Sequence, residues 1–370
     1  MTLSGRPLLD TRPDQLIFVD RVDEMSRIRT ALNQGLNCLV VGERGSGKTS
    51  LVRALMFQAR QQAGPADQPS PELLYVRGAG AENASELLAR AADALARHLG
   101  DPPTDRSHGG PAEVSQNGPA GMSHGGPSGM SHSSVSGQIA ELGERVGKDR
   151  ELSSAGHVVV ALDDAPSGPG NALFGVLRDE LWSIDLRWLV TVATDECGAL
   201  TRPPADAFFE SQVELGPLPV GVSVEILRRR MTDPSERLLE EAAAIGGGNP
   251  RRLLDVVREF DGGSSKWSEF SAAANERRQA LVRLGRSAKL LASELEALGG
   301  ASASDDRLLS RMGWTRARAV QVLGELEEAN LVTAISEKTG QGRPRKVYKV
   351  VSPAQFLQRG LGARGQGPAA

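Results

Sequence analysis

The sequence predicts an α/β fold, in which a parallel sheet core with a helical lid precedes a C-terminal winged helix-turn-helix domain. Three observations lead to this prediction. Short apolar runs alternate with amphipathic helical patterns up to about residue 219, which is typical of a parallel sheet covered on both faces. Only helical patterns follow, from 220 to about 260. Closely spaced helices and a hairpin with a Gly-rich tip then occupy 280–352.

The composition is that of a soluble protein with more than one domain. The 370 residues are 39% hydrophobic and 24% charged, and the chain is too long for one ordinary core. The net charge of −3 means that any surface for nucleic acid must be local. Cys38 and Cys197 form no CxxC pair, which argues against a disulfide framework or a zinc site. No apolar run reaches the length of a membrane span, so we expect a cytoplasmic protein without membrane contact.

The core is predicted from apolar strands and the helices between them. Each strand is a short run rich in branched apolar residues, and each helix repeats apolar residues every three or four positions. The predicted strands are Asn37–Val41, Leu73–Arg77, His157–Leu162, Leu186–Thr194 and Gln212–Leu215. The predicted helices are Arg21–Asn33, Lys48–Arg60, Ala84–Leu99, Gln138–Lys148 and Leu173–Ser183.

Composition shifts along the chain predict the domain boundaries. Residues 101–136 are rich in Gly, Pro and Ser and repeat SHGGP, so we predict a disordered insertion that cannot bury a core. Its histidines, His108, His124 and His132, lack the regular spacing of metal ligands, and we interpret them as part of a biased loop rather than a metal site. The predicted units are a flexible arm (1–15), the α/β core (16–219), the helical lid (220–262), the winged helix (280–352) and a flexible tail (353–370).

A phosphate-binding loop follows the first strand directly. The segment reads Gly42-Glu43-Arg44-Gly45-Ser46-Gly47-Lys48-Thr49 and continues with Ser50, which matches G-x-x-x-x-G-K-[ST] at the start of a helix. Backbone N–H groups of such a loop surround phosphate oxygens, and the helix N-terminus adds a favourable dipole. We expect Lys48 to reach the β- and γ-phosphates of ATP and Thr49 to bind Mg²⁺.

Two acids end the third predicted strand. Asp163 and Asp164 follow the apolar run from His157 to Leu162. In P-loop proteins an acid at this position holds Mg²⁺, and its neighbour can polarise the attacking water. We therefore predict Asp163 as a Mg²⁺ residue and Asp164 as the catalytic base.

Further motifs lie before and after the loop in a recognisable order. The box from Phe18 to Met25 resembles F-x-G-R-x-x-E-L, with Asp20 in place of the usual Gly. Together with Val192-Ala193-Thr194-Asp195 and Gly247-Gly248-Asn249-Pro250-Arg251-Arg252, the chain resembles AAA+ ATPases of the origin-recognition and replication-initiator branch, whose bacterial relatives grade into STAND-type regulatory ATPases.

This resemblance implies roles for particular residues. Thr194 would be the sensor-1 residue near the γ-phosphate, and Arg251, with Arg252 as the alternative, would reach that phosphate from the lid. It also allows a homo-oligomer formed through the AAA+ core. Asp164 stands where fast AAA+ hydrolases carry Glu, and an acid one carbon shorter suits slow turnover. Arg202 lies roughly where a trans-acting arginine would sit.

The C-terminal region predicts three helices and a wing. The helices are Arg286–Leu298, Ser304–Arg311 with Ser304 as its cap, and a third that Thr315 caps and that runs to about Ala329. In the third helix, Val320, Leu323 and Leu326 are predicted to face the core. Its outward residues are predicted to be Arg316, Arg318, Gln321 and Val322.

The wing is a basic hairpin of the strands Leu331–Ser336 and Arg345–Val351. Its cations are Lys338, Arg343, Arg345, Lys346 and Lys349, with no acid between 338 and 349. This pattern resembles bacterial winged-helix DNA-binding domains, so double-stranded DNA is the expected partner. Under that interpretation Arg316, Arg318 and Gln321 contact bases, while the wing follows phosphates. The alternative is a winged helix that contacts protein.

Together the motifs predict a slowly hydrolysing AAA+ ATPase whose nucleotide state controls DNA binding by the winged helix. One alternative is a STAND-like transcriptional or defence regulator. The other is a non-hydrolysing, nucleotide-binding scaffold that uses the winged helix for protein contacts.

Overall fold

The computed structural model describes residues 3–61, 71–100, 135–152, 157–260, 264–337, 345–352 and 355. The predicted disordered insertion lies outside these residues except for Val135 and Ser136, which begin a helix. The predicted flexible tail also lies outside them except for Gln355.

A parallel sheet forms the centre of the core, as the sequence predicts. Its strands are β1 (Cys38–Gly42), β2 (Glu72–Arg77), β3 (Val158–Asp163), β4 (Arg187–Ala193) and β5 (Ser211–Leu215). They lie in the order β2-β3-β4-β1-β5, and all pairings are parallel. Because parallel strands end at one edge, the loops after β1, β3 and β4 meet there. This confirms the predicted fold class of the core.

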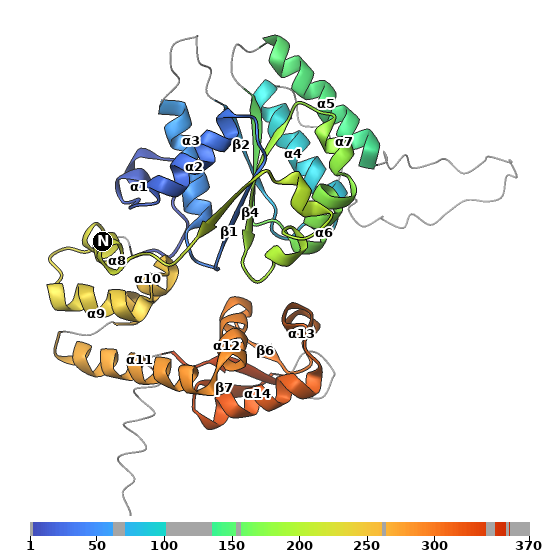
Figure 1. Cartoon of the computed structure of the whole chain (residues 1–370). Helices are drawn as coiled ribbons and strands as arrows, with labels where there is room; N and C mark the ends of the chain where they lie inside the picture. The colour runs from blue at the N-terminus through green and yellow to red at the C-terminus, as the bar shows by residue number, and fades with distance from the viewer. Residues whose placement is uncertain are drawn as a thin grey trace, which may run out of the picture.

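Helices cover both faces of this sheet (Figure 1). One face packs against α2 (Val22–Asn33) and α3 (Lys48–Gln61), and the other against α4 (Ala84–Leu99), α5 (Val135–Leu152), α6 (Ser167–Asn171) and α7 (Arg178–Trp182). In β3, Val158, Val160 and Leu162 face the second layer, whereas Val159 and Ala161 face the first. This alternation buries both faces, which is why the strand is a continuous apolar run.

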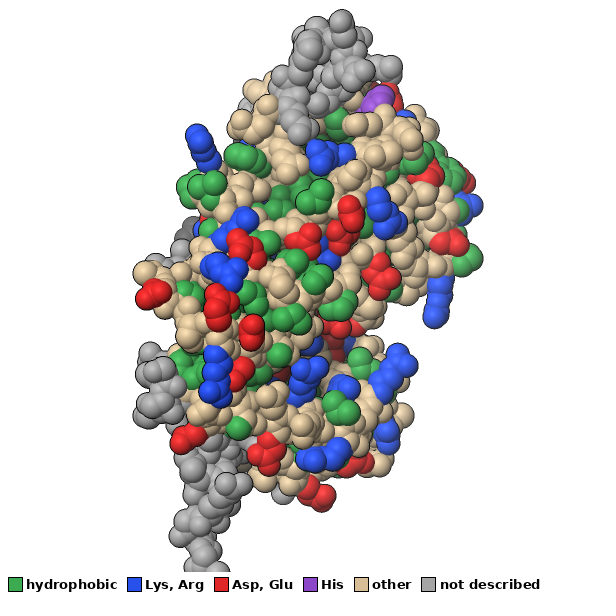
Figure 2. All heavy atoms as spheres, turned by 60° about the vertical axis from the view of Figure 1, so that its left-hand side comes forward, with side chains coloured by type: hydrophobic (Ala, Val, Ile, Leu, Met, Phe, Trp, Pro, Cys, Tyr) green, Lys and Arg blue, Asp and Glu red, His purple; other side chains and the backbone are tan. Residues whose placement is uncertain are grey.

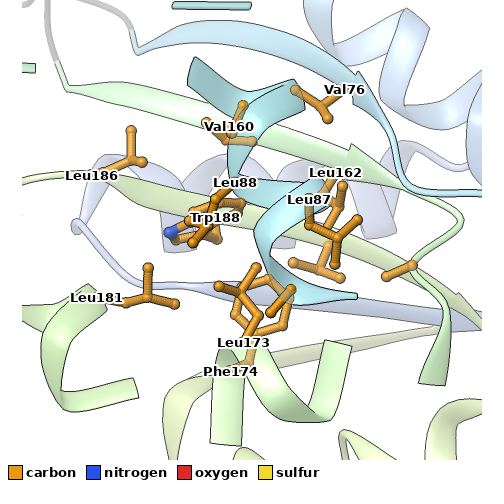
Figure 3. Packing of buried hydrophobic residues seen from close by; sticks show 14 of the residues in the cluster. Val76, Leu87, Leu88, Val160, Leu162, Leu173, Phe174, Leu181, Leu186 and Trp188 are labelled. Atoms are coloured by element: carbon orange, nitrogen blue, oxygen red, sulfur yellow. The ribbon is translucent and has the colours of Figure 1, made fainter. Parts of the chain in front are cut away.

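Aromatic side chains fill the second layer. Trp188 of β4 lies fully buried among side chains from α4 and from the segment that contains Leu173 and Phe174 (Figure 3). Its ring centroid is 5.3 Å from that of Phe174, in an edge-to-face arrangement. The continuous helix predicted over Leu173–Ser183 is wrong in detail, because a π-helical turn (Ala172–Val176) separates α6 from α7.

The N-terminal residues differ from the predicted flexible arm. Leu8 is buried, and so is Asp14, which lies in the short helix α1 (Arg12–Leu16). The backbone N–H of Leu8 donates to Ser50 Oγ at 3.1 Å, and Arg6 pairs with Asp14 at 2.6 Å. The segment has little apolar periodicity, so its order comes from specific polar bonds rather than from a helical face.

The lid is a separate helical layer. It contains α8 (Val220–Arg228), α9 (Glu236–Gly246) and α10 (Pro250–Glu259), which share a hydrophobic cluster with the first half of α11 (Ser264–Leu284). The second half of α11 contributes Ala280 to a different cluster, that of the C-terminal unit. One helix therefore belongs to both layers and joins them. Among the residues that the structure describes, no helix is long and apolar enough to cross a membrane.

The C-terminal unit has the element order expected of a winged helix (Figure 1). It consists of α12 (Arg286–Leu298), β6 (Ala301–Ser302), α13 (Asp306–Met312), α14 (Arg316–Glu328), β7 (Val332–Glu337) and β8 (Arg345–Val350). The strands form an antiparallel sheet in the order β6-β8-β7. The tip between β7 and β8, with Lys338 and Arg343, lies outside the described residues.

Two details of this unit correct the prediction. Asp305 rather than Ser304 caps α13, because its carboxylate accepts from the N–H of Arg307. In α14, Val322 is fully buried whereas Val320 is 50% exposed. The buried stripe starts at Ala319, so Val322, Leu323 and Leu326 follow it at helical spacing.

Candidate nucleotide site

The predicted phosphate-binding loop lies between β1 and α3 and is held against the lid. The side-chain amide of Asn249, the N-cap of α10, donates to the carbonyl of Arg44 at 3.0 Å. The N–H of Arg251 lies 3.3 Å from the carbonyl of Gly45. Gly45 has φ +85°, and a Cβ there would lie 2.7 Å from Asn249 Oδ1 and from Arg251 Cβ. Only glycine therefore fits where lid and loop meet.

A cavity opens beside this loop. One wall is polar and comes from the loop residues 44–50 together with Asp163, Asp164, Arg21, Arg230 and Arg251. The other wall is mainly apolar and comes from the N-terminal segment and the lid. Its apolar residues are Leu8, Ile17, Phe18, Val19, Leu218, Ile226 and Leu254. Such a cavity suits a ligand with an apolar ring system at one end and anionic groups at the other.

Lys48 and Ser46 give the loop donor groups that suit phosphate. Lys48 is buried, and its Nζ donates to the carbonyls of Gly42 at 2.8 Å and Glu43 at 3.1 Å. Burial lowers the pKa of Lys48, while the carboxylates of Asp164 and Asp163 act in the opposite direction. The buried Ser46 Oγ has no hydrogen-bond partner among the described residues. A phosphate oxygen would satisfy Ser46 Oγ and could accept the remaining N–H of Lys48.

Asp163 is oriented by three hydroxyl groups. Oδ2 accepts from Thr49 at 2.7 Å and from Tyr75 at 2.9 Å, and Oδ1 accepts from Thr191 at 2.7 Å. Burial, followed by the charge of Asp163, raises the pKa of Tyr75 to about 12, so its hydroxyl remains a donor at neutral pH. A carboxylate and a hydroxyl side by side are suitable oxygen ligands for Mg²⁺.

Sequence reasoning missed Thr191 and Tyr75. Thr191 is fully buried, and besides bonding Asp163 it accepts from the N–H of Asp164 at 2.8 Å. The available signal was a single hydroxyl residue in the middle of the apolar strand LRWLVTVAT. Tyr75 gave a weaker signal, because aromatic residues are common in strands.

The remaining predicted residues take different positions. Asp164 lines the cavity, with φ +60° at the turn after β3. Thr194 is exposed and its N–H donates to the carbonyl of Gly42, but its side chain is not part of the cavity wall. Arg251 lines the cavity, whereas Arg252 points to the carboxylate of Glu43 at 3.7 Å. Arg202 is exposed.

An ion-pair junction connects the loop to the C-terminal unit. The guanidinium of Arg44 lies 3.3 Å from Asp195 and 2.5 Å from Glu196, both just after β4. Glu196 lies 3.7 Å from Arg311 of α13, which also pairs with Glu294 of α12 at 3.2 Å. Burial and the nearby Asp195 raise the pKa of Glu294. We call these five residues the junction. α12 and α13 lie on the side of the C-terminal unit that faces the core (Figure 1).

The predicted base-contacting residues are exposed on α14. Arg318 donates to Gln321 at 2.9 Å and to Ser287 at 3.3 Å. Arg316 and, on β8, Arg345 are also exposed. Lys346 pairs with Glu327 at 2.9 Å, so part of the charge predicted for the wing is neutralised within the unit.

Comparison with known proteins identifies the core. Residues 17–195 match the AAA ATPase domain family, so this part of the chain is an AAA ATPase domain, which is a nucleotide-binding domain. No curated protein sequence matches the chain.

Three solved structures illustrate the similarity of this chain to known structures. The Orc1 protein of Aeropyrum pernix in complex with DNA is 16% identical with a TM-score of 0.50, and the match covers 98% of each chain. Cdc6p of Pyrobaculum aerophilum is 15% identical (TM-score 0.48, 98% of this chain and 97% of that one). RuvB of Thermotoga maritima is 14% identical with a TM-score of 0.40, and the match covers 98% of this chain and 99% of RuvB. At such identities, the likeness to Orc1 shows a common fold.

Proposed function

We propose that this chain is an ATP-binding AAA+ protein with slow hydrolysis, whose nucleotide state controls binding of double-stranded DNA by a C-terminal winged helix. The observation that carries the proposal is the junction. It places Arg311 of the C-terminal unit and Arg44 of the phosphate loop against the same carboxylate, Glu196. A ligand at the loop and the position of the C-terminal unit would therefore influence each other through one shared partner.

The cavity supports ATP and Mg²⁺ as ligands. In the proposal, loop N–H groups and Lys48 bind the phosphates, and Thr49 and Asp163 hold Mg²⁺, which neutralises phosphate charge. Asp164 orients the attacking water, and Arg251 approaches the terminal phosphate from the lid. The shorter acid at Asp164, compared with the Glu of fast relatives, is the reason to propose slow turnover. This also favours a STAND-like regulator as the second candidate.

Control of DNA binding would use two connections. A terminal phosphate near the loop would attract Arg44 and weaken its ion pair with Glu196. Glu196 would then be free to pair more closely with Arg311. In addition, α11 packs with the lid through its first half and with the C-terminal unit through its second. Movement of the lid upon ATP binding would therefore be carried to the C-terminal unit by the same helix.

The test measures duplex DNA affinity with ATP, with ADP and without nucleotide. The proposal predicts a difference between nucleotide states that disappears in Lys48→Ala, because that variant loses phosphate contacts and keeps its fold. The Asp163→Asn variant should still bind nucleotide but should lose Mg²⁺-dependent hydrolysis. DNA affinity that is the same in every state would overturn the proposed control. Fast DNA-stimulated hydrolysis would favour an initiator-like ATPase. Slow hydrolysis with operator-specific DNA binding would favour a regulator. Absence of both hydrolysis and DNA binding would favour a scaffold.

Oligomer formation through the core is part of the proposal. Arg202 is exposed on the segment after β4, where a neighbouring copy could receive it. Arg202→Ala should then lower hydrolysis at high protein concentration and leave ATP binding unchanged.

A further inference from the structure

A second group of cations lies next to the predicted base-contacting residues. Arg283, at the end of α11, and Arg286 and Lys289, in the first turns of α12, are all exposed. The tight turn at Gly285 separates the two helices. These residues belong to a segment, RLGRSAKL (283–290), that contains no acid.

Contacts place this segment beside the start of α14. Arg318 donates to Ser287 Oγ at 3.3 Å and lies over the ring of Trp314, with 5.6 Å between its Cζ and the ring centroid. Residues 314–324 also contain no acid. The first turns of α12 and α14 are therefore neighbours, and we call the surface of Arg283, Arg286, Lys289, Arg316 and Arg318 the basic corner. Lys and Arg side chains gather over the C-terminal unit, the lower part of the molecule in Figure 2.

The charges of the basic corner are not neutralised within the protein. In the described parts of the chain, no carboxylate pairs with Arg283, Arg286, Lys289 or Arg316. Four exposed arginines of the lid behave differently, since Arg228, Arg229, Arg237 and Arg258 each pair with a nearby acid. Unpaired cations on a chain with net charge −3 repel one another and favour a polyanionic partner.

We propose that the basic corner binds the phosphate backbone of double-stranded DNA beside the bases that α14 contacts. The inference rests on the proposed function, because it requires that α14 approaches DNA. It adds a backbone contact on α12 to those of the wing, where Lys346 is already paired with Glu327. Duplex DNA carries one charge per about 1.7 Å of axis, so a neighbouring row of cations meets several phosphates.

The test compares two triple variants in a salt titration of affinity for a random duplex of about 30 base pairs. Arg283→Ala/Arg286→Ala/Lys289→Ala removes three exposed cations of the corner. The matched control, Arg77→Ala/Arg97→Ala/Lys148→Ala, removes three exposed cations of the core. The corner variant should lower the slope of log K against log salt by about 0.9 per lost phosphate contact, and the control should not change it.

Additional measurements separate the two proposals. The corner variant should lose affinity equally on preferred and random sequences, whereas Arg316→Ala should lose more on the preferred one. Binding of a fluorescent ATP analogue and the far-UV spectrum should equal those of wild type, which shows that the variant is folded. If wild type binds DNA and the corner variant keeps its salt slope, the basic corner is wrong and the proposed function stands. If wild type binds no duplex at low salt in any nucleotide state, both fail.

Discussion

Replacing Thr191 with Val should destabilise the core far more than its small change in shape suggests. The two side chains have nearly the same volume, and Thr191 is fully buried in β4. The variant would lose the bond to Asp163 Oδ1 at 2.7 Å and would leave the N–H of Asp164, now bonded at 2.8 Å, without an acceptor. Both groups lie at the edge of the sheet where the turn after β3 is formed.

The expected loss follows from these two bonds. A buried polar group left without its partner costs about 1–3 kcal/mol, and the value is larger when one partner is charged. Asp163 keeps its bonds to Thr49 and Tyr75. We therefore expect Thr191→Val to lower the free energy of unfolding by about 2–4 kcal/mol. The control Thr191→Ser keeps the hydroxyl and removes one methyl group, which costs about 1 kcal/mol.

Urea unfolding followed by far-UV circular dichroism measures this difference. Thr191→Val should have a lower midpoint than Thr191→Ser, with similar slopes, because the surface exposed on unfolding is nearly the same. A Val variant as stable as wild type would refute the claim that this hydroxyl holds the acid turn. So would a Ser variant that loses as much as Val, because the methyl group would then be the important part.

Three further predictions concern other groups. Tyr75→Phe should weaken Mn²⁺ binding to the nucleotide complex about tenfold, measured by electron paramagnetic resonance, because Asp163 loses an orienting donor; unchanged affinity would remove Tyr75 from the site. Glu294→Gln should raise the urea midpoint of unfolding most at higher pH. The raised pKa of Glu294 means that the folded state binds this proton more tightly than the unfolded state, so the wild type loses stability as pH rises through that pKa. A parallel shift at every pH would contradict this. Asp14→Asn should speed chymotrypsin cleavage after Leu8, detected by mass spectrometry, because the segment loses the ion pair between Arg6 and Asp14; equal rates would show that other contacts hold the segment.

Local patterns were sufficient to place the glycine-rich loop after β1, Asp163 at the end of β3 and the strands of the parallel sheet. The loop needs its glycines and lysine in consecutive order, and a strand buried on both faces must be a continuous apolar run. Such features depend on neighbours in sequence, so one sequence reveals them. The start of α10 also has a local cause, because the Asn249 side chain caps the helix and Pro250 occupies its first turn.

Features that depend on distant segments were not predictable. Residues 3–16 are held in place by individual hydrogen bonds, such as that from the Leu8 N–H to Ser50 Oγ, and such bonds leave no periodic pattern in the sequence. The junction joins Arg44 to Arg311 through acids after β4, and charged residues at these positions look like ordinary surface residues. In α14, the choice between Val320 and Val322 depended on where the helix meets α12, since both lie within one turn of a buried Leu.

Helix α12 takes part in two surfaces at once. Its first turn holds Arg286 and Ser287 at the basic corner, and Glu294 lies in the junction, eight residues and about 12 Å further along the axis. A hydrogen-bonded helix of this length moves as a rod, so displacement at one end is transmitted to the other. Thermodynamic linkage makes such a connection reciprocal: if ATP changes DNA affinity tenfold, about 1.4 kcal/mol, DNA must change ATP affinity by the same factor. Binding to a DNA site would then change which nucleotide the protein retains, so DNA would act as an allosteric effector of nucleotide binding.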